Sequence, residues 1–152
     1  MNVGDKVPDY LGVDETGKEW HSSDFRGSKW VLYFYPKDNT SGCTAEACSL
    51  RDAMPRFQEL SLPVLGVSKD SVASHLKFKA THQLPFPLIS DTETILQQAM
   101  GVWVEKSMYG RKYMGTQRTS FLIDEEGTIL YKWEGREIKT KEHASQILAI
   151  LQ

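Results

Sequence analysis

Long apolar runs and clusters of basic residues are both absent from this sequence of 152 residues. The longest apolar stretch, around residues 31–35, is far shorter than the ~20 residues that a membrane-spanning helix needs. The formal net charge is −2, so the sequence does not predict a nucleic-acid partner. The N-terminal segment MNVGDKVPDY lacks the apolar core of a secretory signal. We therefore expect a cytoplasmic protein that binds neither membranes nor nucleic acids.

Cysteine is also scarce, because the chain contains only Cys43 and Cys48. Thiols of cytoplasmic proteins are mostly kept reduced, and the disulfides that do form there tend to be transient and catalytic. A chain of this length can bury a core without a covalent cross-link. No C-x-x-C motif is present, which argues against a general disulfide oxidoreductase. The alternative is a pair of inert buried thiols, since free cysteine packs like a small hydrophobic residue.

The four histidines are scattered along the sequence, at His21, His75, His82 and His143. A structural zinc site needs four ligands, and the two cysteines have no second pair or histidine cluster near them in the sequence. Each histidine is therefore expected to be a surface or core residue, and we expect no metal ion.

Strand and helix signals alternate along the chain. Strands are expected at 11–13, 19–21, 30–35, 63–68, 86–90, 120–123 and 128–133, and helices at 41–60, 71–82, 92–100 and 141–151. Pro55 predicts a kink or break in the first helix. The early strand–helix–strand order implies parallel strands with a right-handed crossover, and the last hairpin adds antiparallel strands. The pattern predicts one domain over residues 1–152, an α/β thioredoxin-like fold with a mixed central sheet, helices on both faces and an N-terminal β-hairpin.

Cys43 is expected just beyond the carboxyl end of the first buried strand, in the first turn of the following helix. Ligand sites in open α/β sheets gather at the carboxyl ends of strands. The first helical turn also offers free N–H groups and a partial positive charge, which favour a thiolate. This position predicts a reactive sulfur rather than an inert thiol.

The spacing of the two cysteines restricts how they can pair. On a helix, residues five apart are about 500° around and about 7.5 Å along the axis. A disulfide needs Cα atoms within about 7 Å and converging Cβ vectors, so the bond cannot form while the helix is intact. Either the thiols never pair, or the first turns unwind, which Gly42 makes easier. The second alternative suggests a cycle in which Cys43 attacks an electrophile and Cys48 then resolves it through a disulfide.

Three polar residues are candidates for activating Cys43. Thr40 can cap the helix or place its hydroxyl group beside the sulfur. Arg118 stands at the start of a buried strand, where it needs an anion such as a thiolate or a carboxylate, unless it lies at the exposed sheet edge. Glu46 can hold Arg118 through a charge-assisted hydrogen bond, or it can be a solvated acid favoured by the helix dipole.

Several segments of the sequence resemble the peroxiredoxins. The stretch from Pro36 to Cys43, PKDNTSGC, resembles the peroxiredoxin motif P-x-x-x-T-x-x-C, and Glu46 follows three residues later. Cys48 resembles the resolving cysteine of the Q-type, or bacterioferritin-comigratory-protein, branch. Further similar segments lie at 5–9, 85–91 and 118–124, so the resemblance spans nearly the whole chain.

The resemblance implies a thiol peroxidase that works without metal, haem or flavin. Cys43 would be the peroxidatic cysteine, which a hydroperoxide oxidises to a sulfenic acid. Arg118 and Thr40 would hold the peroxide oxygens, and Pro36 would shape and shield the pocket. Cys48 would form an intrachain disulfide that thioredoxin, or alternatively glutaredoxin or glutathione, reduces. This branch is often monomeric, so a monomer is expected.

The sequence departs from the pattern of that branch at Ser41, where many relatives have proline. Proline presets the first helical turn, so its loss is expected to ease unwinding. The chain also lacks the C-terminal extension and Gly-Gly-Leu-Gly segment by which other branches slow resolution. We therefore expect resistance to overoxidation, which sulfinic acid at Cys43 after modest peroxide would contradict. The alternative function is a thioredoxin-fold redox sensor or chaperone module without turnover.

Overall fold

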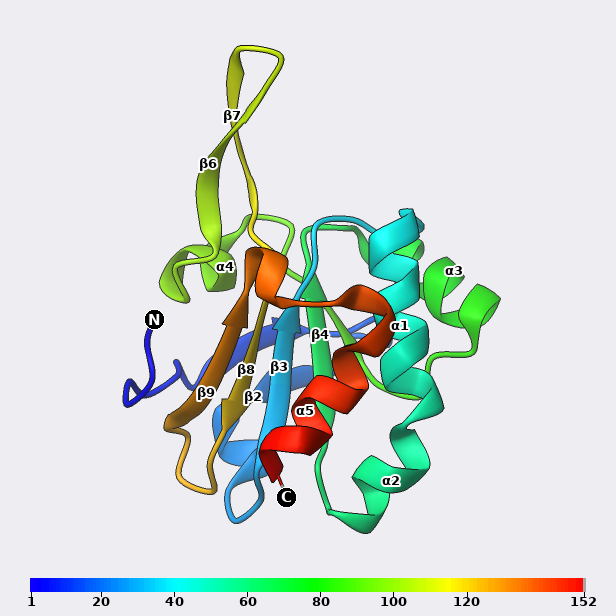
Figure 1. The fold of residues 1–152 in the computed structure, drawn as a ribbon, viewed down its shortest axis with the longest axis vertical. Coiled ribbons are helices and arrows are strands. Elements are labelled where there is room, and N and C mark those ends of the chain that lie inside the picture. Colours follow the sequence, from blue (N-terminus) through cyan, green and yellow to red (C-terminus); the bar gives the residue numbers. More distant parts are fainter. Residues whose placement is uncertain (152) are drawn as a thin grey trace.

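A mixed five-stranded sheet forms the centre of the protein, described here from a computed structural model of residues 1–151 (Figure 1). Its strand order is β5-β4-β3-β8-β9. β3 pairs in parallel with β4, and β4 with β5, whereas β8 is antiparallel to both β3 and β9. The strands are β3 (Trp30–Phe34), β4 (Val64–Ser68), β5 (Leu88–Ser90), β8 (Thr119–Ile123) and β9 (Ile129–Glu134). The predicted mixed sheet is confirmed.

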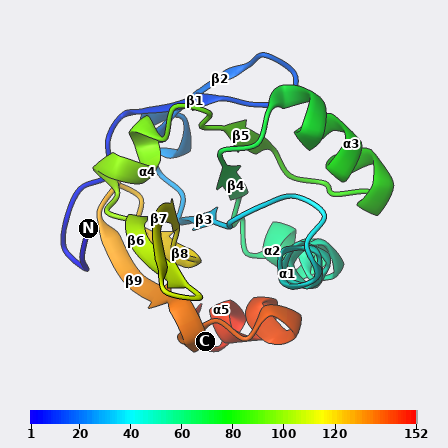
Figure 2. The same ribbon diagram turned by 90° about the horizontal axis from the view of Figure 1, so that it is seen from above.

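Helices and a hairpin cover the two faces of this sheet. In Figure 2, α1, α2 and α5 lie on one face, and α4 and the N-terminal hairpin of β1 and β2 lie on the other. The bounds are β1 (Tyr10–Val13), β2 (Glu19–His21), α1 (Ser41–Asp52), α2 (Met54–Glu59), α3 (Val72–His82), α4 (Ile95–Ala99) and α5 (His143–Leu151). Short 3-10 helices are η1 (Ser22–Phe25), η2 (Gly135–Glu137) and η3 (Thr140–Glu142). None of the helices in residues 1–151 is long and apolar enough to cross a membrane.

The central strand β3 is buried along its whole length because both of its faces are covered. Its side chains alternate between two cores. Tyr33 faces the core beneath α1, α2 and α5, together with Phe57, whereas Leu32 and Phe34 face the opposite core. This continuous apolar strand ends in the loop that leads directly to Cys43.

The helix expected over residues 41–60 is broken, as Pro55 predicts. α1 ends at Asp52, Ala53 intervenes, and Pro55 lies in the first turn of α2. Proline is tolerated there because the N–H group that it lacks would have no helical partner. The break leaves α1 as a separate helix that carries both cysteines.

Several element bounds differ from the sequence expectations. The strand expected at 86–90 begins at Leu88, and the helix expected at 92–100 is shorter, because Thr94 has a left-handed backbone (φ 60°) that cannot continue a helix. The last helix begins at His143, since the preceding residues form a 3-10 turn. Gly101 follows α4 with φ 75°, as expected of a residue that ends a helix.

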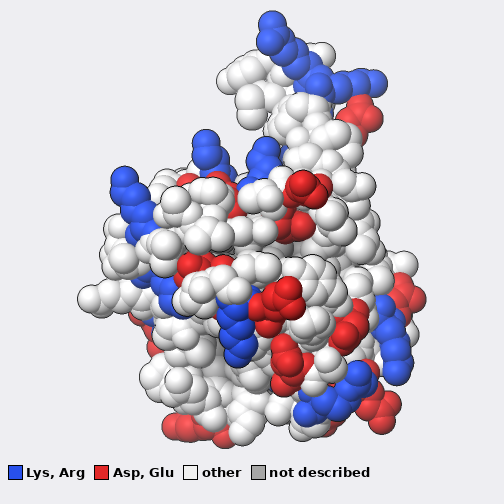
Figure 3. Space-filling model, turned by 180° about the vertical axis from the view of Figure 1, so that it is seen from behind, with Lys and Arg blue, Asp and Glu red and all other residues white. Residues whose placement is uncertain are grey.

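A hairpin of β6 (Trp103–Met108) and β7 (Arg111–Thr116) was not expected and projects from the body of the molecule (Figure 1). Its turn residues, Tyr109 and Gly110, both have positive φ, which is the geometry of a two-residue hairpin turn. Lys and Arg side chains gather near its end (Figure 3). The alternating apolar pattern of a half-buried strand is missing here because most of the hairpin faces solvent on both sides.

Candidate active site

Cys43 lies where the sequence places it, beyond the carboxyl end of β3 and in the first turn of α1. Its side chain is 1% exposed and belongs to the core beneath α1 and α5. The neighbouring Gly42 permits a close approach, because a Cβ atom there would lie 3.2 Å from Nη2 of Arg118. A side chain at position 42 would therefore press against the guanidinium group.

Arg118 joins the sulfur to a carboxyl group. It lies between β7 and β8, and its Nη2 donates a hydrogen bond to Sγ of Cys43 at 3.3 Å. Its Nη1 donates to Oε1 of Glu46 at 2.6 Å. The planar fork of a guanidinium group suits this arrangement, because its nitrogens can bind two anions at once. Arg118 is therefore not an exposed arginine at the sheet edge.

Glu46 is fully buried, so it is not a solvated acid of the first helical turn. Burial raises the pKa of its carboxyl group to about 7, although the charge and hydrogen bond of Arg118 act to lower it. Its second oxygen, Oε2, has no hydrogen-bond partner among residues 1–151 and lies 3.8 Å from Nε2 of His143. The carboxyl group therefore orients Arg118 with one oxygen and faces an imidazole ring with the other.

Thr40 occupies the N-cap position of α1, but its hydroxyl group does not cap the helix. Oγ1 instead donates a hydrogen bond to the carbonyl oxygen of Lys37 at 2.8 Å, which tightens the loop before Cys43. The side-chain cap expected from the sequence is thus replaced by a turn within the loop. Pro36 stands half-buried at the start of the same loop.

Cys48 lies farther along α1 and is half-buried, and both cysteines are free thiols. α1 is unbroken from Ser41 to Asp52. Helical geometry therefore separates the two side chains around the axis, as the five-residue spacing predicts. A bond between the two sulfurs requires part of this helix to unwind.

Several neighbours of the candidate site were not identified from the sequence. His143 was expected to be a surface or core residue, and it is buried beside Glu46 with Nε2 2.7 Å from Oγ of Ser120. Tyr33 has a buried hydroxyl group for which the described part of the chain offers no hydrogen-bond partner. Lys106, on the projecting hairpin, has a lowered pKa because of partial burial and the positive charge of Arg118. Of these residues only Tyr33 carried a signal in the sequence, as a polar group within a buried strand that needs a partner.

A second polar cluster includes Asp38, in the loop that precedes α1. Nδ1 of His75 lies 2.8 Å from Oδ2 of Asp38, and Oδ2 of Asp70 accepts from the backbone N–H of Asp38 and from Oγ of Ser68. These three side chains could together offer ligand atoms to a metal ion. Their hydrogen bonds already account for the arrangement, so His75 is a core residue, as expected.

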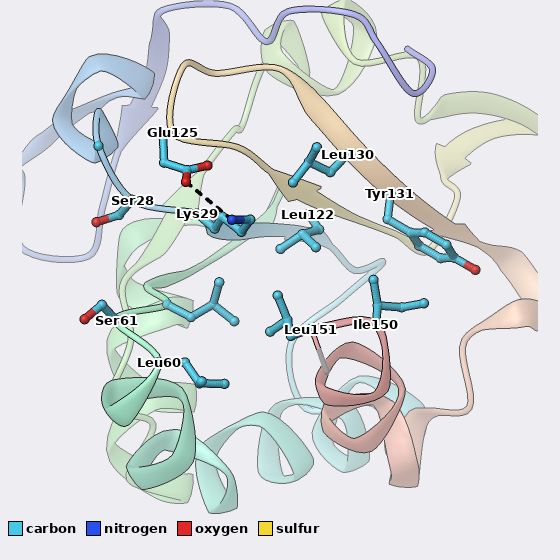
Figure 4. Close-up of a pocket in the computed structure, with 12 residues that line it drawn as sticks. Ser28, Lys29, Leu60, Ser61, Leu122, Glu125, Leu130, Tyr131, Ile150 and Leu151 are labelled. Atoms are coloured by element: carbon cyan, nitrogen blue, oxygen red, sulfur yellow. Dashed lines mark hydrogen bonds and ion pairs between the residues drawn. The ribbon is translucent and has the colours of Figure 1, made fainter.

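A cavity lies elsewhere in the molecule, away from Cys43 (Figure 4). It has a volume of about 450 Å³ and is lined by apolar residues such as Leu60 and Ile150, with the ion pair of Lys29 and Glu125 at its edge. It contains none of the candidate residues. The candidate site therefore rests on the geometry around Cys43.

A buried thiol at a helix start, hydrogen-bonded to arginine at the carboxyl end of a strand in a thioredoxin-like sheet, is the arrangement of a thiol-dependent peroxidase. A family model described as the AhpC/TSA family matches residues 3–132. Peroxiredoxin Bcp of Bacillus subtilis is 44% identical over 152 residues, which covers 100% of this chain and 96% of the relative. A putative peroxiredoxin bcp of Coxiella burnetii is 42% identical over 99% of each chain. The chain belongs to the AhpC/TSA family, and it is a peroxiredoxin similar to the Bcp proteins.

Solved structures agree with this assignment. A crystal structure of a Xylella fastidiosa PrxQ mutant matches with a TM-score of 0.91 and 37% identity, covering 99% of this chain and 95% of that one. A structure that gives insights into the alkyl peroxide reduction activity of the Xanthomonas campestris bacterioferritin comigratory protein matches with a TM-score of 0.86 and 35% identity, over 97% of each chain. The thioredoxin-like peroxiredoxin fold is thus confirmed.

Proposed function

We propose that this peroxiredoxin reduces hydrogen peroxide and organic hydroperoxides with Cys43 as the attacking thiolate. The observation that carries the proposal is the guanidinium group of Arg118, which binds Sγ of Cys43 and Glu46 at the same time. This contact and the start of α1 both favour a negative charge on the sulfur. The alkyl peroxide activity named for the Xanthomonas campestris relative supports organic hydroperoxides as substrates.

In the first step, the thiolate of Cys43 attacks the terminal oxygen of the hydroperoxide. An S–O bond forms, the O–O bond breaks, and the leaving oxygen takes up a proton to give water or an alcohol. Arg118 donates to the peroxide oxygens and stabilises the charge that develops on the leaving oxygen, and Thr40, whose hydroxyl group donates to Lys37, accepts the O–H of the hydroperoxide. Pro36 shapes the pocket and shields the sulfenic acid, and Glu46 orients Arg118.

In the second step, the thiolate of Cys48 attacks the sulfenic sulfur of Cys43. A disulfide forms and the hydroxyl group leaves as water after protonation. Because α1 separates the two side chains, the turns that contain Cys43 must unwind first. Ser41 and Gly42 at this end of the helix lower the cost of unwinding.

A dithiol protein such as thioredoxin then returns both sulfurs to the thiol state with two electrons, and glutaredoxin is the alternative reductant. We place the protein in the cytoplasm as a monomer, with residues 1–152 acting as one domain. Two free cysteines suit a reducing compartment. Light scattering of the purified reduced and oxidised protein measures the oligomeric state.

Substitution of each cysteine tests the mechanism in an assay coupled to thioredoxin, its reductase and NADPH. Cys43→Ser abolishes peroxide consumption. Cys48→Ser consumes one peroxide per chain and then stops with a sulfenic acid that a dimedone-type reagent traps. Normal cycling of Cys48→Ser with thioredoxin would show that Cys48 is not the resolving thiol.

A further inference from the structure

Behind Cys43, a buried carboxyl group and a buried imidazole ring face each other across α1 and α5. The side chains of Glu46 and His143 are both 0% exposed. Oε1 of Glu46 accepts a hydrogen bond from Arg118, whereas Oε2 accepts none and lies 3.8 Å from Nε2 of His143. A buried carboxylate oxygen without a hydrogen-bond donor is costly, so the protonation state of Glu46 needs an explanation.

The hydrogen bonds around His143 determine which ring nitrogen carries a hydrogen atom. The amide of Gln146 accepts the backbone N–H of Lys139 at its Oε1 (3.1 Å) and donates from its Nε2 to the carbonyl oxygen of Glu137 (2.8 Å). Oε1 is therefore an acceptor, and Nδ1 of His143, 2.9 Å away, is the donor. Nε2 of the neutral ring then carries the lone pair, which accepts a hydrogen bond from Oγ of Ser120 at 2.7 Å, while the free carboxyl oxygen lies 3.8 Å away.

The space between Oε2 of Glu46 and Nε2 of His143 therefore suits one proton. When the carboxyl group of Glu46 is protonated at Oε2, that oxygen is neutral and faces the acceptor edge of the His143 ring at 3.8 Å. Without that proton, two acceptors face each other and a buried negative charge lacks half of its partners. Burial raises the pKa of Glu46 to about 7 and lowers the pKa of His143 to about 4, and both effects place the proton on the carboxyl group.

Arg118 links this proton to the charge on the sulfur, because one guanidinium group binds both partners. While Cys43 is a thiolate, two anions compete for one cation, which favours the protonated form of Glu46. When oxidation makes the sulfur neutral, the full charge of Arg118 acts on Glu46. This favours loss of the proton from the carboxyl group.

We propose that Glu46 and His143 form a one-proton store whose occupancy follows the charge on Cys43, and that the proton it releases balances the one that peroxide reduction consumes. The proposal rests on the proposed function of Cys43. Attack of the thiolate leaves an alkoxide or hydroxide ion that needs one proton. As the sulfur loses its negative charge, the store gives up one proton, so the overall step draws less from the solvent. Ionisation of the regenerated thiol of Cys43 supplies the proton that reloads the store.

Other groups around the store do not replace it. Burial, and then the charges of Glu46 and Cys43, raise the pKa of Tyr33 well above its ordinary value, so its phenol stays protonated. Ser120, on β8, has a hydroxyl group that does not titrate, and the ring of Trp133, on β9, meets His143 edge-on. The charge of Lys106 acts on Arg118 and on the sulfur. Glu46 and His143 hold a proton and position Arg118, whereas Cys43 carries the reaction.

Proton uptake during oxidation tests the proposal directly. Reduced protein with the Cys48→Ser substitution, which stops at the sulfenic acid, is mixed with one equivalent of hydrogen peroxide in weak buffer containing a pH indicator. The pH is chosen so that ultraviolet absorbance shows the Cys43 thiolate. The parent protein is expected to take up clearly fewer protons than Glu46→Gln, which keeps an oxygen for Arg118 but has no proton to release. Equal uptake by the two proteins overturns the proposal.

A second pair of variants keeps the test decisive if Glu46→Gln does not fold. In His143→Gln, the new amide can donate to Oε2 and so favours the carboxylate, which shifts the pH dependence of proton uptake to lower pH. His75→Gln is the matched control, because His75 is equally buried but belongs to the Asp38 network. Identical pH dependence of proton uptake in His143→Gln and His75→Gln overturns the proposal of a proton store. Absence of any sulfenic acid in the parent protein contradicts instead the proposed function of Cys43.

Discussion

Replacement of Arg118 by methionine tests how strongly the guanidinium group supports the reactive sulfur. Methionine keeps much of the side-chain length but removes the donor that lies 3.3 Å from Sγ of Cys43. A hydrogen bond to a charged group contributes about 1.5–3 kcal/mol. At 1.36 kcal/mol for each tenfold change, the ratio of thiolate to thiol should fall by about 10- to 150-fold at a given pH. The rate of peroxide reduction should fall in proportion to the thiolate fraction, and further because the leaving oxygen also loses a donor.

The same substitution removes the partner of a buried carboxyl group. Glu46 has no exposed surface, so in the variant it is expected to be protonated rather than an unpaired anion. The variant should therefore fold. Arg118→Lys is the matched control, since its compact ammonium group can approach one anion but cannot bind both as a planar fork does. Its thiolate content should lie between those of the parent and Arg118→Met.

The assay follows the ultraviolet absorbance of the thiolate against pH in a Cys48→Ser background, in which Cys43 is the only sulfhydryl group. The rate of alkylation by iodoacetamide at the same pH values provides an independent measure. The transition should move to higher pH in Arg118→Met and by less in Arg118→Lys. A transition at the same pH in all three proteins would refute the role of Arg118 in holding the charge on the sulfur.

Three predictions concern the framework that holds the site. Phe57→Ala empties a fully buried position and should cost about 3–5 kcal/mol in denaturant unfolding. Gly66→Ala should cost about 1–3 kcal/mol, because the new Cβ would lie 2.9 Å from Cε1 of Tyr33, whereas an unchanged midpoint would show that the core can adjust. Burial alone would raise the pKa of Asp38, but the hydrogen bonds led by His75 lower it. The contribution of ionised Asp38 to stability is therefore complete above its unfolded pKa of about 3.9 and is lost as the pH falls through its lower pKa in the folded protein. Asp38→Asn should reduce this loss when unfolding is measured as a function of pH.

The sequence was most informative where the relevant interactions are local. A continuous apolar strand followed by helix signals places Cys43 at a helix start beyond a strand end, and Pro55 predicts the break that isolates α1. The separation of the Cys43 and Cys48 side chains around the helix axis follows from their five-residue spacing and helical geometry alone, without knowledge of the rest of the fold. The projecting hairpin was missed because its exposed strands carry little of the burial pattern from which strands are predicted.

By itself, the sequence determined the order of the main elements and the position of the two thiols, and it left Arg118 either beside an anion or at an exposed sheet edge. Only the tertiary structure showed that this arginine binds two groups, across separations of 75 residues to Cys43 and 72 to Glu46. It also placed the ring of His143 against the free carboxyl oxygen. Local order follows from patterns of neighbouring residues. Contacts between distant side chains, and the charges that they share, depend on how separate strands and helices pack against one another.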